Sequence, residues 1–289
     1  MASIKPHLNG YRVQLYTLAD ACARWRREEA GKRAGGKWER VRLLRFERDD
    51  WLAKRRLEAL EPSDFSNWRD ARLNKVKPAS VAREMNILRA VLELARKEWG
   101  WLRTNPMQDV RWPKCPRGRA RRVSAEEVDA LSKAFGVADE LRADTAIERI
   151  GLAFLFALET GMRSGEICAL TWPDIHQCDR YVTVKKSKNG DSRDVPLTPR
   201  AVEILDALPI KSGAAFDLDD KTRDVLFRRV RDKTPHRDVH FHDARSEAIW
   251  RLSKKLDILE LARVIGHRDV KSLMIYFRAD ASELARRFG

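Results

Sequence analysis

The chain has 289 residues, of which 43% are hydrophobic, so it can form two domains with buried cores rather than a small disulfide-stapled scaffold. Lys and Arg number 58 against 43 Asp and Glu, a net charge of +15. This excess predicts a polyanionic partner, with nucleic acid as the first hypothesis. A generic basic surface, or ribosomal or membrane association, is the alternative interpretation of the charge.

The compartment is predicted from what the sequence lacks. Its four cysteines have no CxxC spacing, which is typical of a protein in a reducing compartment. No apolar run approaches the roughly 20 residues of a membrane span. The first ten residues, MASIKPHLNG, contain no apolar signal segment. We therefore expect a soluble cytoplasmic protein without membrane association.

The first part of the chain is predicted to be mainly helical. Asn9-Gly10 precedes an alternating run and indicates a hairpin within residues 1–16. Thr17 and Asp20 form a capping-box pattern, and helical sequence continues through 49–60 and 64–73. The clearest helix covers 78–100, with a buried stripe at Val81, Met85, Leu88, Leu92 and Ala95. Residues 17–108 are thus expected to form a helical domain.

A basic segment follows at 109–121. Prolines and a glycine break regular structure there. Together with the next residue, Arg122, this segment contributes six positive charges: Arg111, Lys114, Arg117, Arg119, Arg121 and Arg122. We interpret it as a linker along a phosphate backbone, with a merely solvated linker as the alternative. Ser124 and Glu127 then cap a new helix, so a second domain is predicted over 122–289.

The second domain is predicted to be mainly α with a small β-sheet. Residues 146–160 are apolar on most faces, which indicates a central buried helix ended by Gly161. The stretch YVTVKKSKNGDSRDVPL alternates on both sides of Asn189-Gly190 and predicts a hairpin. Helices return from about Asp243.

Several polar residues of this domain stand in places that favour chemistry. Arg163 follows the glycine stop and lies three residues before Glu166, so it either forms a structural pair or faces an anion. Lys188 lies at the hairpin tip. His242 and Arg245 share a helix face. Two further residues are His267, after Gly266, and Tyr276, nine residues later. The histidine spacings match no zinc pattern, so no metal is expected.

In this order the motifs resemble the tyrosine recombinase family of the phage-integrase type. The matching stretches are TGMRSGE, SKNG, HDAR, GH and Tyr276. Ser246 and Ala244 depart from the family's usual histidine and leucine at positions without a catalytic role. The resemblance implies a helical core-binding domain, a basic linker and an α+β catalytic domain, which together clamp DNA.

The resemblance also implies the roles of the residues. Tyr276 is the nucleophile that forms a 3′-phosphotyrosine bond, and Lys188 is the general acid. The phosphoryl oxygens are held by Arg163, Arg245, His242 and His267. Glu166 orients Arg163 or His242. The expected reaction needs neither a metal nor another cofactor.

The expected partners are double-stranded DNA, other protomers in a tetrameric synapse, and accessory bending or directionality proteins. The sequence SELARRF after Tyr276 is expected to form a helix, which docks either on a neighbouring protomer or on its own domain. Two other functions stay open from the sequence. One is a type IB topoisomerase, and the other is a catalytically silent DNA-binding regulator on the same fold.

Overall fold

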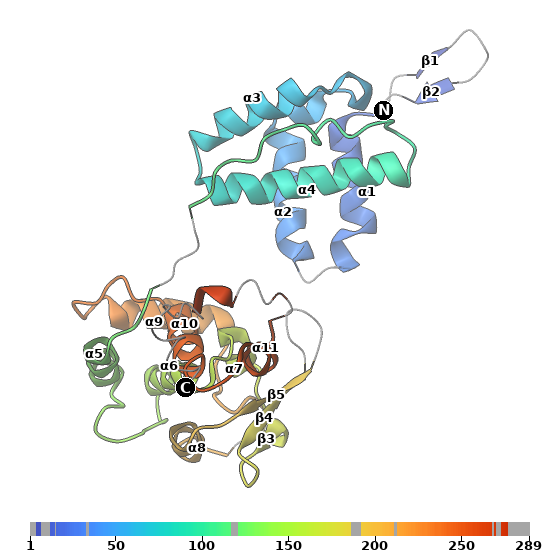
Figure 1. Cartoon of the computed structure of the whole chain (residues 1–289). Helices are drawn as coiled ribbons and strands as arrows, with labels where there is room; N and C mark the ends of the chain where they lie inside the picture. The colour runs from blue at the N-terminus through green and yellow to red at the C-terminus, as the bar shows by residue number, and fades with distance from the viewer. Residues whose placement is uncertain are drawn as a thin grey trace, which may run out of the picture. The chain divides into compact units, whose positions relative to one another are not determined.

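The structure, a computed structural model, describes residues 4–6, 12–14, 16–32, 35–116, 121–185, 192–210, 213–267, 269 and 273–276. The chain divides into two compact units, 1–118 and 119–289 (Figure 1). The division falls within the segment predicted to be a basic linker. Among the described residues, no helix combines the length and the apolar character that a membrane span requires.

The first unit is a helical bundle preceded by two short strands. The strands β1 (Ile4–Pro6) and β2 (Arg12–Gln14) pair antiparallel, as the Asn9-Gly10 signal predicts, although that turn lies outside the described residues. The α-helices are α1 (Leu18–Glu28), α2 (Gly36–Asp49), α3 (Pro62–Leu73) and α4 (Pro78–Lys97). Three short 3₁₀ helices, at Ala30–Lys32, Leu52–Lys54 and Leu57–Ala59, connect them.

The core of this unit forms where the α4 stripe meets the other helices. Each of the five predicted stripe residues is buried, which confirms the prediction. Trp25 and Phe65 are buried in the same cluster. The Tyr16 and Trp101 rings stack against one another with centroids 3.5 Å apart. Each fully buried large apolar side chain contributes about 1.5–3 kcal/mol, so this packing stabilises the bundle.

Residues 49–60 differ from the helical pattern predicted for them. Helix α2 ends at Asp49, and the backbone of Asp50 is extended. The Asp50 carboxylate accepts hydrogen bonds from the backbone N–H of Leu52 at 3.0 Å and from Trp68 Nε1 at 2.6 Å. A side chain that bonds to nearby backbone competes with helix formation. The chain therefore continues as two short 3₁₀ turns.

The second unit is mainly helical with one small sheet. Its α-helices are α5 (Ala125–Phe135), α6 (Ala146–Thr160), α7 (Ser164–Cys168), α8 (Pro199–Asp206), α9 (Asp220–Arg231), α10 (Phe241–Leu252) and α11 (Ile258–Ile265). The antiparallel sheet has the order β3 (Ile175–His176), β4 (Tyr181–Val184) and β5 (Arg193–Pro196). Short 3₁₀ helices lie at Trp172–Asp174 and Met274–Tyr276.

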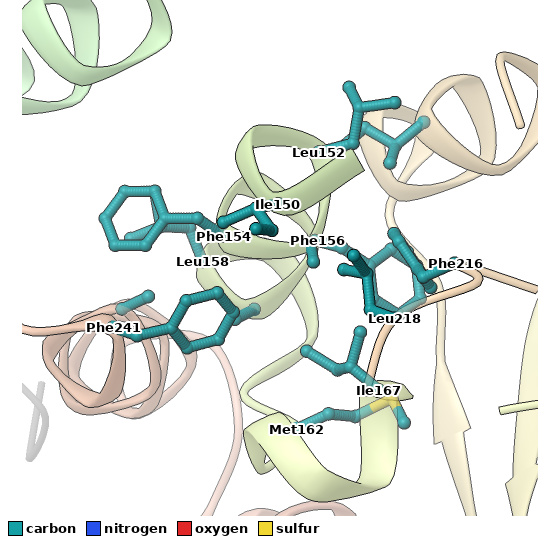
Figure 2. Close-up of a cluster of buried hydrophobic side chains, with 14 of the residues drawn as sticks. Ile150, Leu152, Phe154, Phe156, Leu158, Met162, Ile167, Phe216, Leu218 and Phe241 are labelled. Carbon is teal, nitrogen blue, oxygen red and sulfur yellow. The ribbon is translucent and has the colours of Figure 1, made fainter. Parts of the chain in front are cut away.

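Helix α6 is the centre of this unit, as its composition predicts. It packs against α5, α8, α9 and α10. Phe154 and Phe156 of this helix point to different sides, toward Phe241 and Phe216 respectively (Figure 2). The ring centroids of these pairs are 5.8 and 5.3 Å apart. Because α6 is buried on several faces, its C-terminal end is a rigid point from which the following residues project.

Helix ends determine where the polar residues of the second unit lie. Ser124 and Glu127 form the predicted capping box at the start of α5. Gly161 ends α6 with φ 66°, and Gly266 ends α11 with φ 70°. Glycine adopts this left-handed conformation without the cost that a Cβ imposes. The two glycines turn the chain two residues before Arg163 and one residue before His267.

Candidate active site

Three arginine side chains from different elements converge on the C-terminal end of α11. Arg193, Arg245 and Arg163 donate hydrogen bonds to the carbonyl oxygens of residues 264, 265 and 266, at 2.8, 2.9 and 3.2 Å respectively. The last carbonyls of a helix lack intrahelical partners and carry partial negative charge. This end of α11 therefore helps to hold together three cations that would otherwise repel one another.

Glu166 supplies a full negative charge among these arginines. Its side chain is 5% exposed, and it accepts hydrogen bonds from Arg163 Nη1 at 2.8 Å and from the Arg163 backbone N–H at 2.9 Å. Both terminal nitrogens of Arg193 donate to it, at 3.0 and 2.7 Å. Burial alone would raise the pKa of Glu166, but the bonds from Arg193 and Arg163 outweigh burial and lower the pKa to about 2. The group is a carboxylate at neutral pH.

The cluster has an excess of positive charge, because three guanidinium groups surround one carboxylate. Arg245 is 3% exposed and also donates to the carbonyl of Gly161. Burial, followed by the nearby charge of Arg163, lowers the pKa of Arg245 to about 9. Arg245 is still a cation at neutral pH, and a bound anion would stabilise it. Phosphate oxygens suit such a group because guanidinium donors can pair with them bidentately.

Two histidines stand beside the arginines. His242 lies in the first turn of α10, three residues before Arg245, as predicted. Burial, followed by the charge of Arg245, lowers the pKa of His242. His267 follows Gly266, and its backbone N–H donates to Ala262 O at 3.0 Å. Burial and then the charges of Arg245, Arg163 and Arg193 lower the pKa of His267 to about 4. His267 is therefore a neutral imidazole at pH 7 and can donate one hydrogen bond.

We expect a direct titration of His267 to show this effect. Its imidazole should take up a proton near pH 4 rather than near 6.5, because the protonated form would be a further cation in a positive site. The measurement is a histidine NMR titration of the protein, with His267→Gln to assign the resonance. An occupying anion such as vanadate should raise the midpoint. A midpoint near 6.5 without any anion would contradict the charge arrangement.

Tyr276 packs against α10, which carries Arg245, and against α11, whose last carbonyls bind the three arginines. It lies in the 3₁₀ turn Met274–Tyr276 and contacts a small apolar cluster made of Ile249, Leu261, Ile265 and Leu273. Its backbone is fixed by a bond from its N–H to Leu273 O at 2.9 Å and by a bond from Ser253 Oγ to its carbonyl at 3.3 Å. Its charge, when ionised, would raise the pKa of Arg245. The structure thus brings Tyr276 together with the arginine cluster.

Lys188 lies outside the described residues. The strands on either side of it pair as the hairpin prediction requires, with Val184 opposite Arg193. Arg193 therefore lies directly at the base of the segment that carries the lysine. The part that Arg193 plays in the arginine cluster is not apparent from the sequence motifs. One sequence signal could have indicated that Arg193 points inward. It lies two residues before Val195, which is fully buried, and alternate residues of a strand share a face.

The structure describes four of the six basic linker residues, and two of these four are paired with acids. Arg111 and Lys114 are exposed, and Arg117 and Arg119 lie outside the described residues. Arg121 instead forms ion pairs with Glu127 and Asp238.

Arg122 is bound even more closely to the second unit. It pairs with both oxygens of Glu247, at 2.6 and 3.0 Å, and its guanidinium lies 3.2 Å from the centre of the Trp250 ring. The carboxylates of Glu127, Asp238 and Glu247 therefore balance the positive charges of Arg121 and Arg122. These two residues anchor the end of the linker on the second unit.

Comparisons with known proteins identify relatives over nearly the whole chain. The sequence model described as "Phage integrase family" matches residues 121–283. The chain is 34% identical over 286 residues to a putative integrase/recombinase of Haemophilus influenzae, covering 97% of this chain and 93% of the relative.

Solved structures show the same fold. An integrase of the transposon Tn1549, in complex with circular intermediate DNA, has a TM-score of 0.74 at 17% identity, covering 94% of this chain and 99% of the other. A lambda integrase tetramer bound to a Holliday junction has a TM-score of 0.66 at 22% identity, covering 88% of this chain and 78% of the other.

Proposed function

The chain belongs to the phage integrase family of tyrosine recombinases, and from that premise we propose which of its residues break and rejoin DNA. The family predicted from the five motifs is confirmed. The protein is a site-specific DNA recombinase. We assign its reaction to the cluster around the end of α11.

We propose that the phenol oxygen of Tyr276 attacks a backbone phosphorus of duplex DNA. The bond from phosphorus to the 5′-oxygen breaks as the bond to Tyr276 forms, giving a 3′-phosphotyrosine and a free 5′-hydroxyl. Lys188 gives the leaving oxygen its proton, and the proton that the phenol loses passes to solvent. Because the tyrosyl ester conserves the energy of the broken bond, a 5′-hydroxyl of a second strand can reverse the step without nucleotide hydrolysis.

The observation that carries this proposal is the convergence of Arg163 and Arg245 beside two histidines with a surplus of positive charge. Negative charge increases on the phosphoryl oxygens in the transition state, so preorganised donors stabilise it most. Arg163 and Arg245 hold those oxygens, and the neutral imidazoles of His242 and His267 add hydrogen bonds. Glu166 orients Arg163, which its two bonds to that residue support.

The proposed partners are duplex DNA and further copies of this chain. The similar Tn1549 integrase was solved with DNA, and the similar lambda integrase was solved as a tetramer on a Holliday junction. We propose that this chain likewise forms a tetrameric synapse, in which the two units clamp the duplex. Accessory bending or directionality proteins would act on that complex. The proposed place of action is the cytoplasm of a bacterial cell, in association with the nucleoid when DNA is bound.

The linker gives a prediction about salt dependence. Replacing Arg111, Lys114, Arg117 and Arg119 with Gln should flatten the slope of log affinity against log salt by roughly two to four units, since each phosphate contact contributes about 0.9. Binding to target and random duplexes should weaken alike, because phosphate contacts position without specifying sequence. Salt-dependent fluorescence anisotropy on both duplexes is the measurement.

The matched control is the double variant Arg121→Gln, Arg122→Gln, which removes two cations that acids already neutralise. Its slope should change by less than about one unit. An equal flattening in the two variants would show that the ion pairs open on DNA. An unchanged slope in the first variant would mean that the linker is merely solvated.

A combined assay tests the function. The target is first found by sequencing the junctions that the protein makes beside its own gene. Covalent capture on a nicked duplex of that sequence, followed by strand exchange between two intact duplexes, then separates the candidates. Capture with exchange supports a recombinase. Capture with relaxation of supercoils but no exchange would indicate a type IB topoisomerase, and binding without capture a silent regulator.

A further inference from the structure

Among the described residues, Arg163 and Arg245 donate side-chain hydrogen bonds only through their Nη atoms, whereas Arg193 is engaged through its whole guanidinium. Its side chain is 7% exposed, and each of its three nitrogens donates to a protein oxygen of Glu166 or Val264. Gly266 lies so close to the guanidinium that a Cβ there would approach its Cδ and Nε at 3.0 Å. The side chain of Arg163 is 23% exposed. Arg193 is therefore poorly placed to bind DNA itself.

The bonds of Arg193 bear directly on Arg163 through Glu166. A buried carboxylate needs charged partners, and two parallel bonds from one guanidinium satisfy it best. Arg193 provides that bidentate pair, while Arg163 provides one side-chain bond and one backbone bond. Without Arg193, Arg163 would be the remaining guanidinium bonded to Glu166 among the residues that the structure describes. The carboxylate would then compete with the scissile phosphate for the same donor.

Arg193 also fixes the backbone that precedes His267. Its Nε bond to Val264 O and its contact with Gly266 tie strand β5 to the last turn of α11. The turn at Gly266 determines the direction in which His267 leaves the helix. The side chain of Arg193 thus helps to position two of the proposed phosphate ligands, Arg163 and His267.

We propose, resting on the function proposed above, that Arg193 is a positioning residue of the recombination site. By pairing with both oxygens of Glu166 it limits that carboxylate to one side-chain bond with Arg163, so that Arg163 can also bind the scissile phosphate, and by holding the end of α11 it sets the place of His267.

The first test replaces Arg193 and measures covalent adduct formation in single turnover on the nicked duplex, with DNA at saturation. Arg193→Met should slow the adduct by on the order of a hundredfold, the usual effect of losing one transition-state donor, with DNA affinity unchanged. Arg193→Lys keeps the charge but not the two parallel bonds, so its rate should be intermediate. Arg200→Gln is the control, because this arginine of α8 is exposed and bonded only to the surface residue Glu203 among the described residues. Rates equal to wild type in Arg193→Met would overturn the proposal.

The second test separates positioning from a merely structural role. Adding Glu166→Gln to Arg193→Met removes the charge that captures Arg163, so the double variant should cleave faster than Arg193→Met by on the order of tenfold, within the couplings seen between contacting residues. A structural role predicts a further loss, which would reject the proposal. Thermal unfolding is followed in parallel. If Arg193→Met does not fold, wild-type cleavage by Arg193→Lys would reject the proposal, and partial cleavage would support it. Absence of adduct in the wild type would instead reject the proposed function itself.

Discussion

Tyr276→Phe is expected to bind its DNA site with wild-type affinity and to form no covalent adduct. The substitution removes one oxygen, and that oxygen is the proposed nucleophile. The ring keeps its contacts with the apolar cluster of α10 and α11, so the turn at Met274–Tyr276 should stay in place. The measurement is an SDS-stable protein–DNA band on the nicked duplex, beside a gel-shift titration for affinity.

A second readout separates loss of the nucleophile from loss of the fold in this variant. Thermal unfolding should match the wild type, because no described hydrogen bond of Tyr276 involves its hydroxyl group. The other tyrosine of the second unit, Tyr181, provides a matched control, and Tyr181→Phe should leave the band intact. A persistent band in Tyr276→Phe would assign the nucleophile to another residue.

Arg245→Ala is expected to lower the cleavage rate by about a hundredfold or more. The side chain is proposed to stabilise the transition-state phosphate, and it also bonds the carbonyls of Gly161 and Ile265. Removing it leaves two buried acceptors unsatisfied, each at a cost of about 1–3 kcal/mol. Arg245→Lys restores a charge without reaching both carbonyls, so its cleavage should also be strongly impaired. Single-turnover adduct formation gives the rate.

Arg251→Gln is the matched control for Arg245, on the same helix. Arg251 has a side chain that is 43% exposed, and its partner Glu247 keeps the bonds from Arg122. It should cleave at close to the wild-type rate. Circular dichroism of all three variants shows whether α10 is intact. Near wild-type strand exchange by Arg245→Ala would return this arginine to a purely structural role.

Local signals predicted much of the fold around the site. The capping boxes at Thr17 and Ser124, the glycine end of α6 and the hairpin strands all depend on neighbouring residues, so the sequence contains them directly. The prediction of a helix over 49–60 was wrong for a local and a tertiary reason, because Asp50 bonds both the nearby backbone of Leu52 and the side chain of Trp68. Asp50 bonds Trp68, eighteen residues away, and no periodicity reveals that contact.

The arrangement of the site depends on long-range pairings that motifs do not show. Glu166 is predicted to orient Arg163, which lies three residues away, but its bidentate partner Arg193 comes from a different element. Likewise, a run of linker arginines looks uniformly basic in the sequence. The acids that bind Arg121 and Arg122 include Asp238 and Glu247, more than a hundred residues later. Spacing along the chain identifies candidates, whereas charge balance emerges only from the fold.

The most direct test of the proposed nucleophile is to isolate the covalent adduct from the wild-type protein, digest it, and identify the modified peptide and DNA end by mass spectrometry. We expect a tryptic peptide containing Tyr276 joined through its phenol oxygen to a 3′-phosphate, with the released strand carrying a free 5′-hydroxyl. A nucleotide attached to another residue, or a tyrosyl bond to a 5′-phosphate, would contradict the assignment.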